Sequence, residues 1–213
     1  MRQAESTGLI DQTFVDFMDA CIQCRGCETA CPAGVPFGSM METTREALTQ
    51  QTSYQSWWRR WGYRVLGCPN ILTIGSRALA VLQRLKLLPS KLALPKIPLM
   101  QAPLVPSGED VWLFTGCVMD VWMRDTHRAT QRVIEAAGAG VRFPDKKAAC
   151  CGALHVHAGL GEEARRLARR TMSAFPGDAP ILVDSAGCGA QMKEYGHLLN
   201  TSDAHKFSQR VLD

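Results

Sequence analysis

The chain has 213 residues, of which 46% are hydrophobic and 21% are charged, and its formal net charge is +4. This composition is ordinary for a globular chain of one or two domains and excludes a largely disordered one. The small net charge, without basic and aromatic residues alternating along a strand, argues against a nucleic-acid partner. The sequence has no run of 18 apolar residues, so no membrane-spanning helix is predicted.

The first predicted element is a helix over residues 9–20, because Ile10, Phe14, Phe17 and Met18 recur at helical spacing. A second short helix is predicted over residues 37–50. The segment between the two helices is rich in cysteine. We therefore expect an all-helical module built around a cysteine loop.

The loop carries four cysteines at the spacing C-x2-C-x2-C-x3-C-P: Cys21, Cys24, Cys27 and Cys31. This spacing is that of bacterial ferredoxins, in which the thiolates hold a [4Fe-4S] cluster. In two-cluster ferredoxins the fourth cysteine serves the other cluster, so Cys31 either reaches a neighbouring cluster or closes this one, with Cys68 as the alternative fourth ligand. Zinc, which also accepts four thiolates, and inert buried cysteines are the competing interpretations.

Basic amphipathic helices are predicted next, over residues 57–64 and 71–88, where tryptophan, leucine and isoleucine alternate with arginine and lysine. Trp and Arg are favoured at protein interfaces and at membrane boundaries. The competing interpretation is a packed helix with solvated arginines. Five prolines between Pro89 and Pro106 then predict an extended linker, where we place the domain boundary.

Strands alternate with helices beyond the linker, which predicts a small parallel sheet. The predicted strands cover residues 111–114, 140–143 and 181–183. The predicted helices cover residues 120–137, closed by Gly138, then 160–175 and 206–212.

A second group of cysteines comes at the ends of apolar runs or in turns: Cys117, Cys150, Cys151 and Cys188. The carboxyl ends of parallel strands meet at one sheet edge, so these thiols are expected to converge and to hold a second cluster or zinc. Adjacent cysteines are strained as two ligands of one ordinary cubane, but they can bridge irons or leave one thiol free. His155 and His157 are expected to be hydrogen-bond partners rather than ligands, and His127 to be solvated. Nine clustered cysteines without a predicted signal peptide favour a reducing, cytoplasmic setting.

Three segments carry a family resemblance: Cys27–Val35, Cys150–Leu154 and Ser185–His197. They resemble the cysteine-rich CCG domain proteins, which include heterodisulfide reductases, lactate-utilisation proteins and, most similar in these segments, the iron–sulfur subunits of glycolate oxidase. The family pattern ends in C-x2-C, whereas this sequence has Gln191 at the final position. The upstream ferredoxin run and the second CCG half of the family are not in this sequence, so we expect a fragment or a short form.

The resemblance implies a two-part α+β chain. Its parts are a helical ferredoxin-type module over residues 1–50, basic helices and a Pro-rich linker over 51–106, and the first half of a CCG α/β domain over 107–213. It implies an electron-transfer subunit of a glycolate, or related 2-hydroxy acid, oxidase. FAD would lie on a partner subunit, a quinone or another carrier would accept the electrons, and the complex would be cytoplasmic or peripheral on the inner face of the cytoplasmic membrane.

The chain has no recognisable flavin or nicotinamide fingerprint and no Ser/His/Asp arrangement, so we assign it no catalytic residue. Two other functions remain open from the sequence. One is a heterodisulfide-reductase-like or lactate-utilisation oxidoreductase that uses the Cys150–Cys151 pair. The other is a zinc-stabilised binding module without redox chemistry.

Overall fold

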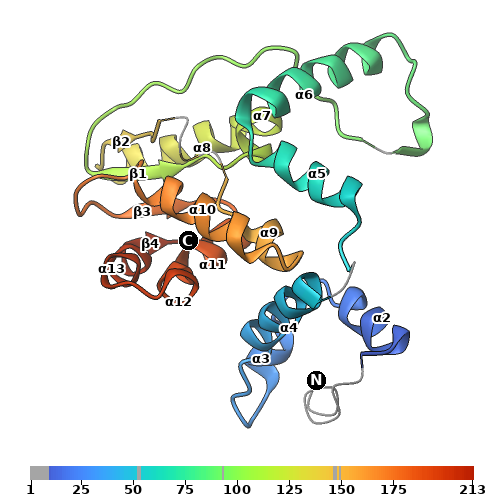
Figure 1. Ribbon diagram of the computed structural model, residues 1–213. Helices are drawn as coiled ribbons and strands as arrows, with labels where there is room; N and C mark the ends of the chain where they lie inside the picture. Colours follow the sequence, from blue (N-terminus) through green and yellow to red (C-terminus); the bar gives the residue numbers. More distant parts are fainter. Residues whose placement is uncertain (1–9, 52–53, 93, 146–147, 149) are drawn as a thin grey trace.

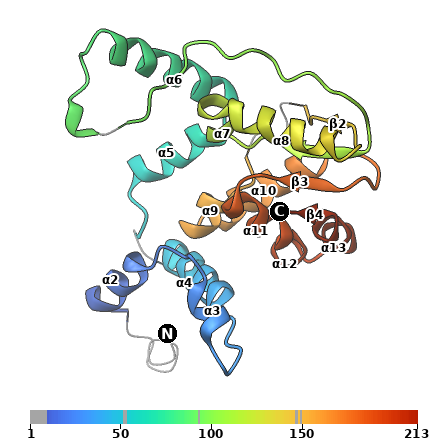
Figure 2. The same ribbon diagram turned by 180° about the vertical axis from the view of Figure 1, so that it is seen from behind.

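The computed structural model of the chain describes residues 10–51, 54–92, 94–145, 148 and 150–213 (Figure 1). Leu9, where the first predicted helix begins, lies outside the described residues. Helices α2 to α4 form one group, the sheet and its covering helices form another, and α5 and α6 lie outside both cores with one side against the sheet region (Figures 1 and 2).

The N-terminal group consists of α2 (Gln12–Ala20), α3 (Gly26–Ala30) and α4 (Phe37–Gln51). Asp11 caps α2 by accepting a hydrogen bond from the Phe14 N–H at 2.8 Å. A small core joins α2 to α4 through Met18, Met41 and Leu48. The predicted apolar stripe is therefore half right: Phe14 and Met18 pack inward, whereas Phe17 is 70% exposed. That this module is ferredoxin-like stays a prediction.

Helices α5 (Trp57–Leu66) and α6 (Pro69–Arg84) follow, with a 3-10 turn, η1, at Ser90–Leu92. The predicted helix over 71–88 was too long, because the chain turns at Lys86, whose φ is +56°. By length and composition no single described helix could cross a membrane; α5 and α6 pass the same test only as a pair, bent by 97°.

The sheet contains four parallel strands in the order β2-β1-β3-β4, which confirms the predicted parallel sheet. The strands are β1 (Val111–Phe114), β2 (Val141–Arg142), β3 (Ile181–Val183) and β4 (Val211–Leu212). The predicted helix over 206–212 was right only for residues 206–209 and wrong at its end. Helix α13 (Ser202–Gln209) ends earlier, and Val211 pairs with Ile181.

Six further helices connect the strands: α7 (Val118–Trp122), α8 (Arg124–Ala136), α9 (Ala153–His157), α10 (Gly161–Met172), α11 (Ala186–Lys193) and α12 (Tyr195–Leu199). The single helix predicted over 120–137 is two helices, because the backbone leaves helical geometry at Met123. Helix α10 matches the prediction over 160–175, although it ends at Met172.

Both faces of the sheet are buried. Trp112 and Phe114 face a core to which α9 to α13 contribute, and Phe175 lies centrally in it, 5.4 Å from the Trp112 ring. Leu113 faces the opposite side, where Ile134 of α8 packs against it. Burial on both faces explains why these strands read as short continuous apolar runs.

Candidate functional site

The first three cysteines of the N-terminal loop line a cavity of about 250 Å³ beside the start of α4. Cys24 and Cys27 are exposed and Cys21 is partly buried. Phe37, Gly38 and Met41 of α4 form the opposite wall. The structure therefore brings Cys21, Cys24 and Cys27 to one cavity, as their spacing predicts.

The backbone of this loop turns tightly at two residues other than glycine. Gln23 and Arg25 have φ values of +56° and +58°, in the left-handed region that such residues rarely occupy. The turn at Gln23 lets its N–H donate to the Cys21 sulfur at 3.4 Å. Both polar atoms of the buried Gln23 amide lack a partner among the described residues, and the residue lines the same cavity. A buried, unpaired amide beside three thiols fits a site that receives a polar group.

Glu28 anchors the loop to α4. Its carboxylate accepts hydrogen bonds of 2.5 Å from the Gly38 N–H and from Arg25 Nε. A Cβ at position 38 would lie 2.9 Å from Arg25 Nε, so the glycine leaves room for this contact. The Arg25 hydrogen bond is the main reason that the pKa of Glu28 lies below its usual value.

Cys31 lies at the end of α3 and does not line the cavity of the first three cysteines. Hydrogen bonds from the backbone N–H groups of Val35, Ala33 and Gly34 lower the pKa of its thiol. Such an environment favours thiolate, the form that binds metal. Cys68 instead precedes α6, at the far end of α5 from the loop (Figures 1 and 2).

The other four cysteines follow three neighbouring strands of the sheet. Cys117 follows β1, the Cys150–Cys151 pair follows β2, and Cys188 lies in the first turn of α11 after β3. Cys150 donates a hydrogen bond to Cys117, and Cys151 donates one to Cys188. The predicted convergence at the carboxyl edge of the sheet is thus present in the structure.

These hydrogen bonds divide the four thiols into two kinds. Cys117 and Cys188 accept, which lowers their pKa, whereas donation raises the pKa of Cys150 and Cys151. The two acceptors are therefore the easier thiols to ionise.

The backbone of the Cys150–Cys151 pair is held from two helices. Thr171 of α10 donates its hydroxyl to the Cys150 carbonyl at 3.0 Å, and Tyr195 of α12 donates to the Cys151 carbonyl at 2.7 Å. Both donors are fully buried. Gly152 then turns the chain into α9 with a φ of +86°, where a Cβ would be strained.

The expectation for His127 was wrong. It is fully buried, and its Nδ1 lies 2.7 Å from Asp184 Oδ2, to which the Thr130 hydroxyl also donates. It faces inward because α8 packs on the sheet. His155 is also buried, with its ring 5.9 Å from that of Tyr63, and burial lowers its pKa and that of His157.

Arg45 of α4 connects the two cysteine regions. The residue is only 6% exposed, and its guanidinium donates to the carbonyls of Met18, Cys21 and His157, the last two at 2.6 and 2.7 Å. Gly159 packs so closely against the same helix that a Cβ there would overlap the Arg45 carbonyl oxygen. The cysteine loop and the helix after the cysteine pair thus share one buried cation.

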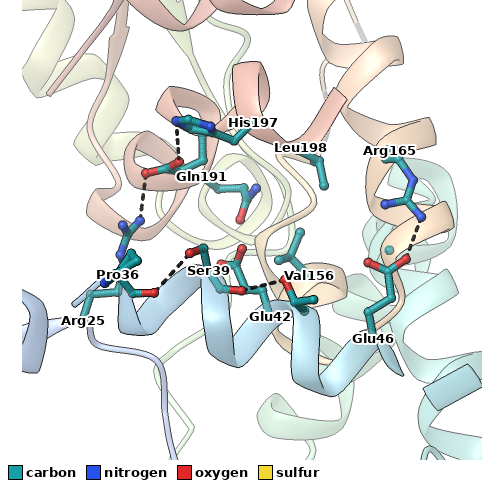
Figure 3. A pocket seen from close by; sticks show the side chains of 14 residues that line it. Arg25, Pro36, Ser39, Glu42, Glu46, Val156, Arg165, Gln191, His197 and Leu198 are labelled. Carbon is teal, nitrogen blue, oxygen red and sulfur yellow. Dashed lines mark hydrogen bonds and ion pairs between the residues drawn. The ribbon is translucent and has the colours of Figure 1, made fainter. Parts of the chain in front are cut away.

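A second cavity, of about 450 Å³, separates α4 from α11 and α12 (Figure 3). Gln191 of α11 and Glu42 of α4 point into it from opposite sides. Two ion pairs bridge its ends, Arg25 to Glu194 at 3.1 Å and Arg165 to Glu46 at 2.7 Å. Gln191, which replaces the last family cysteine, is thus buried between the two cysteine regions.

Replacing Glu42 with glutamine is expected to alter how stability depends on pH. Burial is the main cause that raises the pKa of Glu42 to about 7. The native state then binds more protons than the unfolded state between pH 4.5 and 7, so the free energy of unfolding falls as pH rises through that window. Glu42 is partly solvated, so we expect Glu42→Gln to recover about 1 kcal/mol at pH 8 and almost nothing at pH 4.

Urea denaturation at both pH values measures this difference, with Asp203→Asn, an exposed acid of α13, as the control. A recovery that is equal at pH 4 and pH 8 would contradict the assignment of the proton to Glu42.

The donor sets of both cysteine groups fit a metal cluster that prefers sulfur. Among the described side chains, however, no three metal-binding residues are already drawn together tightly enough to hold a metal ion. The thiols of the loop share a cavity wall, and those at the sheet edge form two hydrogen-bonded pairs. The sequence did not identify Arg45, Glu42 and Glu28 as site residues. A single charged residue on a predicted helix is ordinarily expected to face solvent.

Comparison with protein families gives two matches that coincide with the two cysteine regions. Residues 15–36 match a 4Fe-4S binding domain, and residues 111–193 match the CCG cysteine-rich domain. Comparison with solved structures gives no match.

Curated relatives combine both regions. The chain is 29% identical to the "Probable glycolate oxidase iron-sulfur subunit" of Bacillus subtilis, over 99% of this chain and 54% of the relative. It is 30% identical to the "Glycolate oxidase iron-sulfur subunit" of Escherichia coli, over 86% of this chain and 47% of the relative. A fumarate reductase (CoM/CoB) subunit of Methanothermobacter marburgensis is 35% identical over 50% of this chain and 22% of its own length. The chain spans about half the length of the first two relatives.

Proposed function

We propose that this chain, a homologue of glycolate oxidase iron–sulfur subunits, is an iron–sulfur electron-transfer subunit. Its matches to a 4Fe-4S binding domain and to the CCG cysteine-rich domain support the proposal. One observation carries the proposal. Two groups of cysteines lie in separate parts of the fold, and the buried Arg45 joins these parts by donating to the carbonyls of Cys21 and His157. Its residues hold and tune redox centres and bind no substrate.

In this proposal, Cys21, Cys24 and Cys27 ligate a [4Fe-4S] cluster in the loop cavity, and Cys31 supplies the fourth thiolate. Amides that already stabilise negative charge on the Cys31 sulfur support this choice over Cys68. The cluster supplies one-electron chemistry. The unpaired amide of Gln23 is the group in this loop best placed to donate a hydrogen bond toward a sulfide and so adjust the potential.

Cys117, Cys150, Cys151 and Cys188 are the proposed ligands of a second centre. An iron–sulfur centre takes precedence over zinc because the segment matches the CCG model and its four thiols already pair across three strand ends. The proposal also includes the division of the chain into a cluster-binding module over residues 1–50, a connecting segment over 51–106 and a CCG domain over 107–213.

The electrons would come from a flavin on a partner subunit that oxidises glycolate or a related 2-hydroxy acid to the 2-oxo acid. A quinone or another carrier would receive them, with the complex in the cytoplasm or on the inner face of its membrane. The names of the relatives support the donor reaction. The cysteine-rich composition supports a reducing compartment.

The test is the amount of iron, acid-labile sulfide and zinc per chain in anaerobically purified protein, with an electron paramagnetic resonance spectrum after reduction. Iron and sulfide in equal amounts, with a reduced-cluster signal, are expected. Zinc without sulfide would replace this proposal with that of a structural zinc module.

A further inference from the structure

The segment between the two cysteine regions has an unusual charge composition. Residues 47–108 contain eight lysines and arginines and no aspartate or glutamate. Since the whole chain carries a net charge of only +4, the remainder is acidic. The net positive charge therefore lies on the part of the chain that contains α5 and α6, because that part has no acidic residues.

Large apolar side chains are exposed on the same two helices. On α5, Trp57, Trp58 and Trp61 are 60 to 81% exposed. On α6 and its C-cap residue, one stripe at helical spacing is exposed: Ile71, Ile74, Val81, Leu82 and Leu85. Exposed large apolar side chains gathered on two successive helices that also carry basic residues are typical of an interaction site.

The opposite side of α6 is the one that packs on the protein. Ser76 and Ala80 are buried there, and the Trp122 indole N–H of α7 donates to the Ser76 hydroxyl at 2.9 Å. Ile97 of the following segment is fully buried, and Arg84 donates to its carbonyl. The exposed stripe is thus the outer face of a helix already fixed on its inner face.

Two arginines of α5 have acidic neighbours. Arg59 lies 3.9 Å from Asp19, and Arg64 lies 3.8 Å from Glu163. Within the described part of the chain, Arg60, Arg77 and Lys86 form no ion pair, and all three are exposed. They are available to an external anionic surface.

We propose that the outer face of α5 and α6 binds the surface of an anionic lipid bilayer, with the three tryptophans and the α6 stripe in the headgroup region and the basic residues on lipid phosphates. Tryptophan beside arginine, on helices that carry no carboxylate, is the chemistry of an interfacial membrane helix. Charge complementarity favours anionic lipid, since the basic residues gain electrostatic attraction at an anionic surface and little at a zwitterionic one. A protein partner or a second copy is the competing occupant.

Flotation with vesicles tests the proposal on the full chain. We expect the protein to float with vesicles of phosphatidylglycerol and phosphatidylcholine and to stay behind with phosphatidylcholine alone. Replacing Arg60, Arg77 and Lys86 with glutamine should weaken binding on the order of a hundredfold, because each contributes about 1 kcal/mol at such a surface. Trp57→Ser combined with Trp61→Ser should also abolish flotation.

Control variants remove the same number of basic residues, and one exposed apolar side chain, from elsewhere in the protein. Arg132→Gln, Arg169→Gln and Lys206→Gln remove three exposed basic residues from the sheet region, and Val133→Ser removes an apolar side chain that is 70% exposed. These variants should float like the unaltered protein. Iron content is measured in parallel, so failure of the membrane proposal is separable from failure of the cluster assignment.

Absence of binding to anionic vesicles would overturn the proposal, as would equal losses in the test and control variants. Sedimentation equilibrium tests the main alternative, that this face binds a second copy of the chain. A dimer that the tryptophan variant abolishes, without any vesicle binding, would assign the face to a second copy of the chain instead.

Discussion

Cys24→Ser is expected to remove about four iron and four sulfide per chain, the content of one cubane cluster, while the proposed centre at the sheet edge keeps its own. Cys24 lines the loop cavity together with Cys21 and Cys27, and serine is a poor substitute for a thiolate ligand. Because metal binding and folding are coupled in small ligand-built modules, α2 and α3 should also lose protection from amide exchange.

The matched control is Cys68→Ser, an exposed cysteine at the start of α6. It should retain all its iron, whereas Cys31→Ser should behave like Cys24→Ser. If Cys68→Ser loses the cluster and Cys31→Ser keeps it, the fourth ligand is Cys68, and if Cys24→Ser keeps its iron the loop assignment itself fails.

Arg45→Met is expected to lower the free energy of unfolding by about 3 to 5 kcal/mol, because it leaves buried carbonyls without their charged donor. The three carbonyls belong to Met18, Cys21 and His157, so the loss falls on both cysteine regions at once. Methionine fills much of the volume, so the missing hydrogen bonds dominate the effect. Urea denaturation followed by circular dichroism measures it.

Two further variants separate charge from geometry. Arg45→Lys keeps the charge but loses the planar fork that reaches several carbonyls, so it should fall between the wild type and Arg45→Met. Arg169→Met, on the exposed side of α10, should change stability by less than about 0.5 kcal/mol. An Arg45→Met protein as stable as Arg169→Met would mean that Arg45 does not join the two regions.

The cysteine positions were the most predictable part of the site. Spacing alone brought Cys21, Cys24 and Cys27 together, because two-residue gaps leave the chain few ways to turn. The convergence of Cys117 with Cys150 followed from the rule that parallel strands end at one edge. Both rules act on the backbone and need no knowledge of side-chain partners.

The predictions failed where distant contacts decide the structure. His127 looks solvated in sequence, yet its helix packs on the sheet and buries it against Asp184. Residues 206–212 have helical periodicity, yet pairing with β3 draws Val211 into a strand. Helices of five to eight residues, such as α9 and α11, are too short for periodicity to detect.

The hydroxyl groups of Thr171 and Tyr195 fix the Cys150–Cys151 backbone through its carbonyls, so neither sulfur is needed to hold this backbone in place. The backbone positions of these two cysteines are therefore set by the folded protein rather than by a ligand. If these cysteines hold the proposed centre, a cluster destroyed by oxygen should be rebuilt from iron and sulfide without unfolding of the protein. The cysteine backbone at the sheet edge would then stay in place while the proposed cluster is lost and replaced.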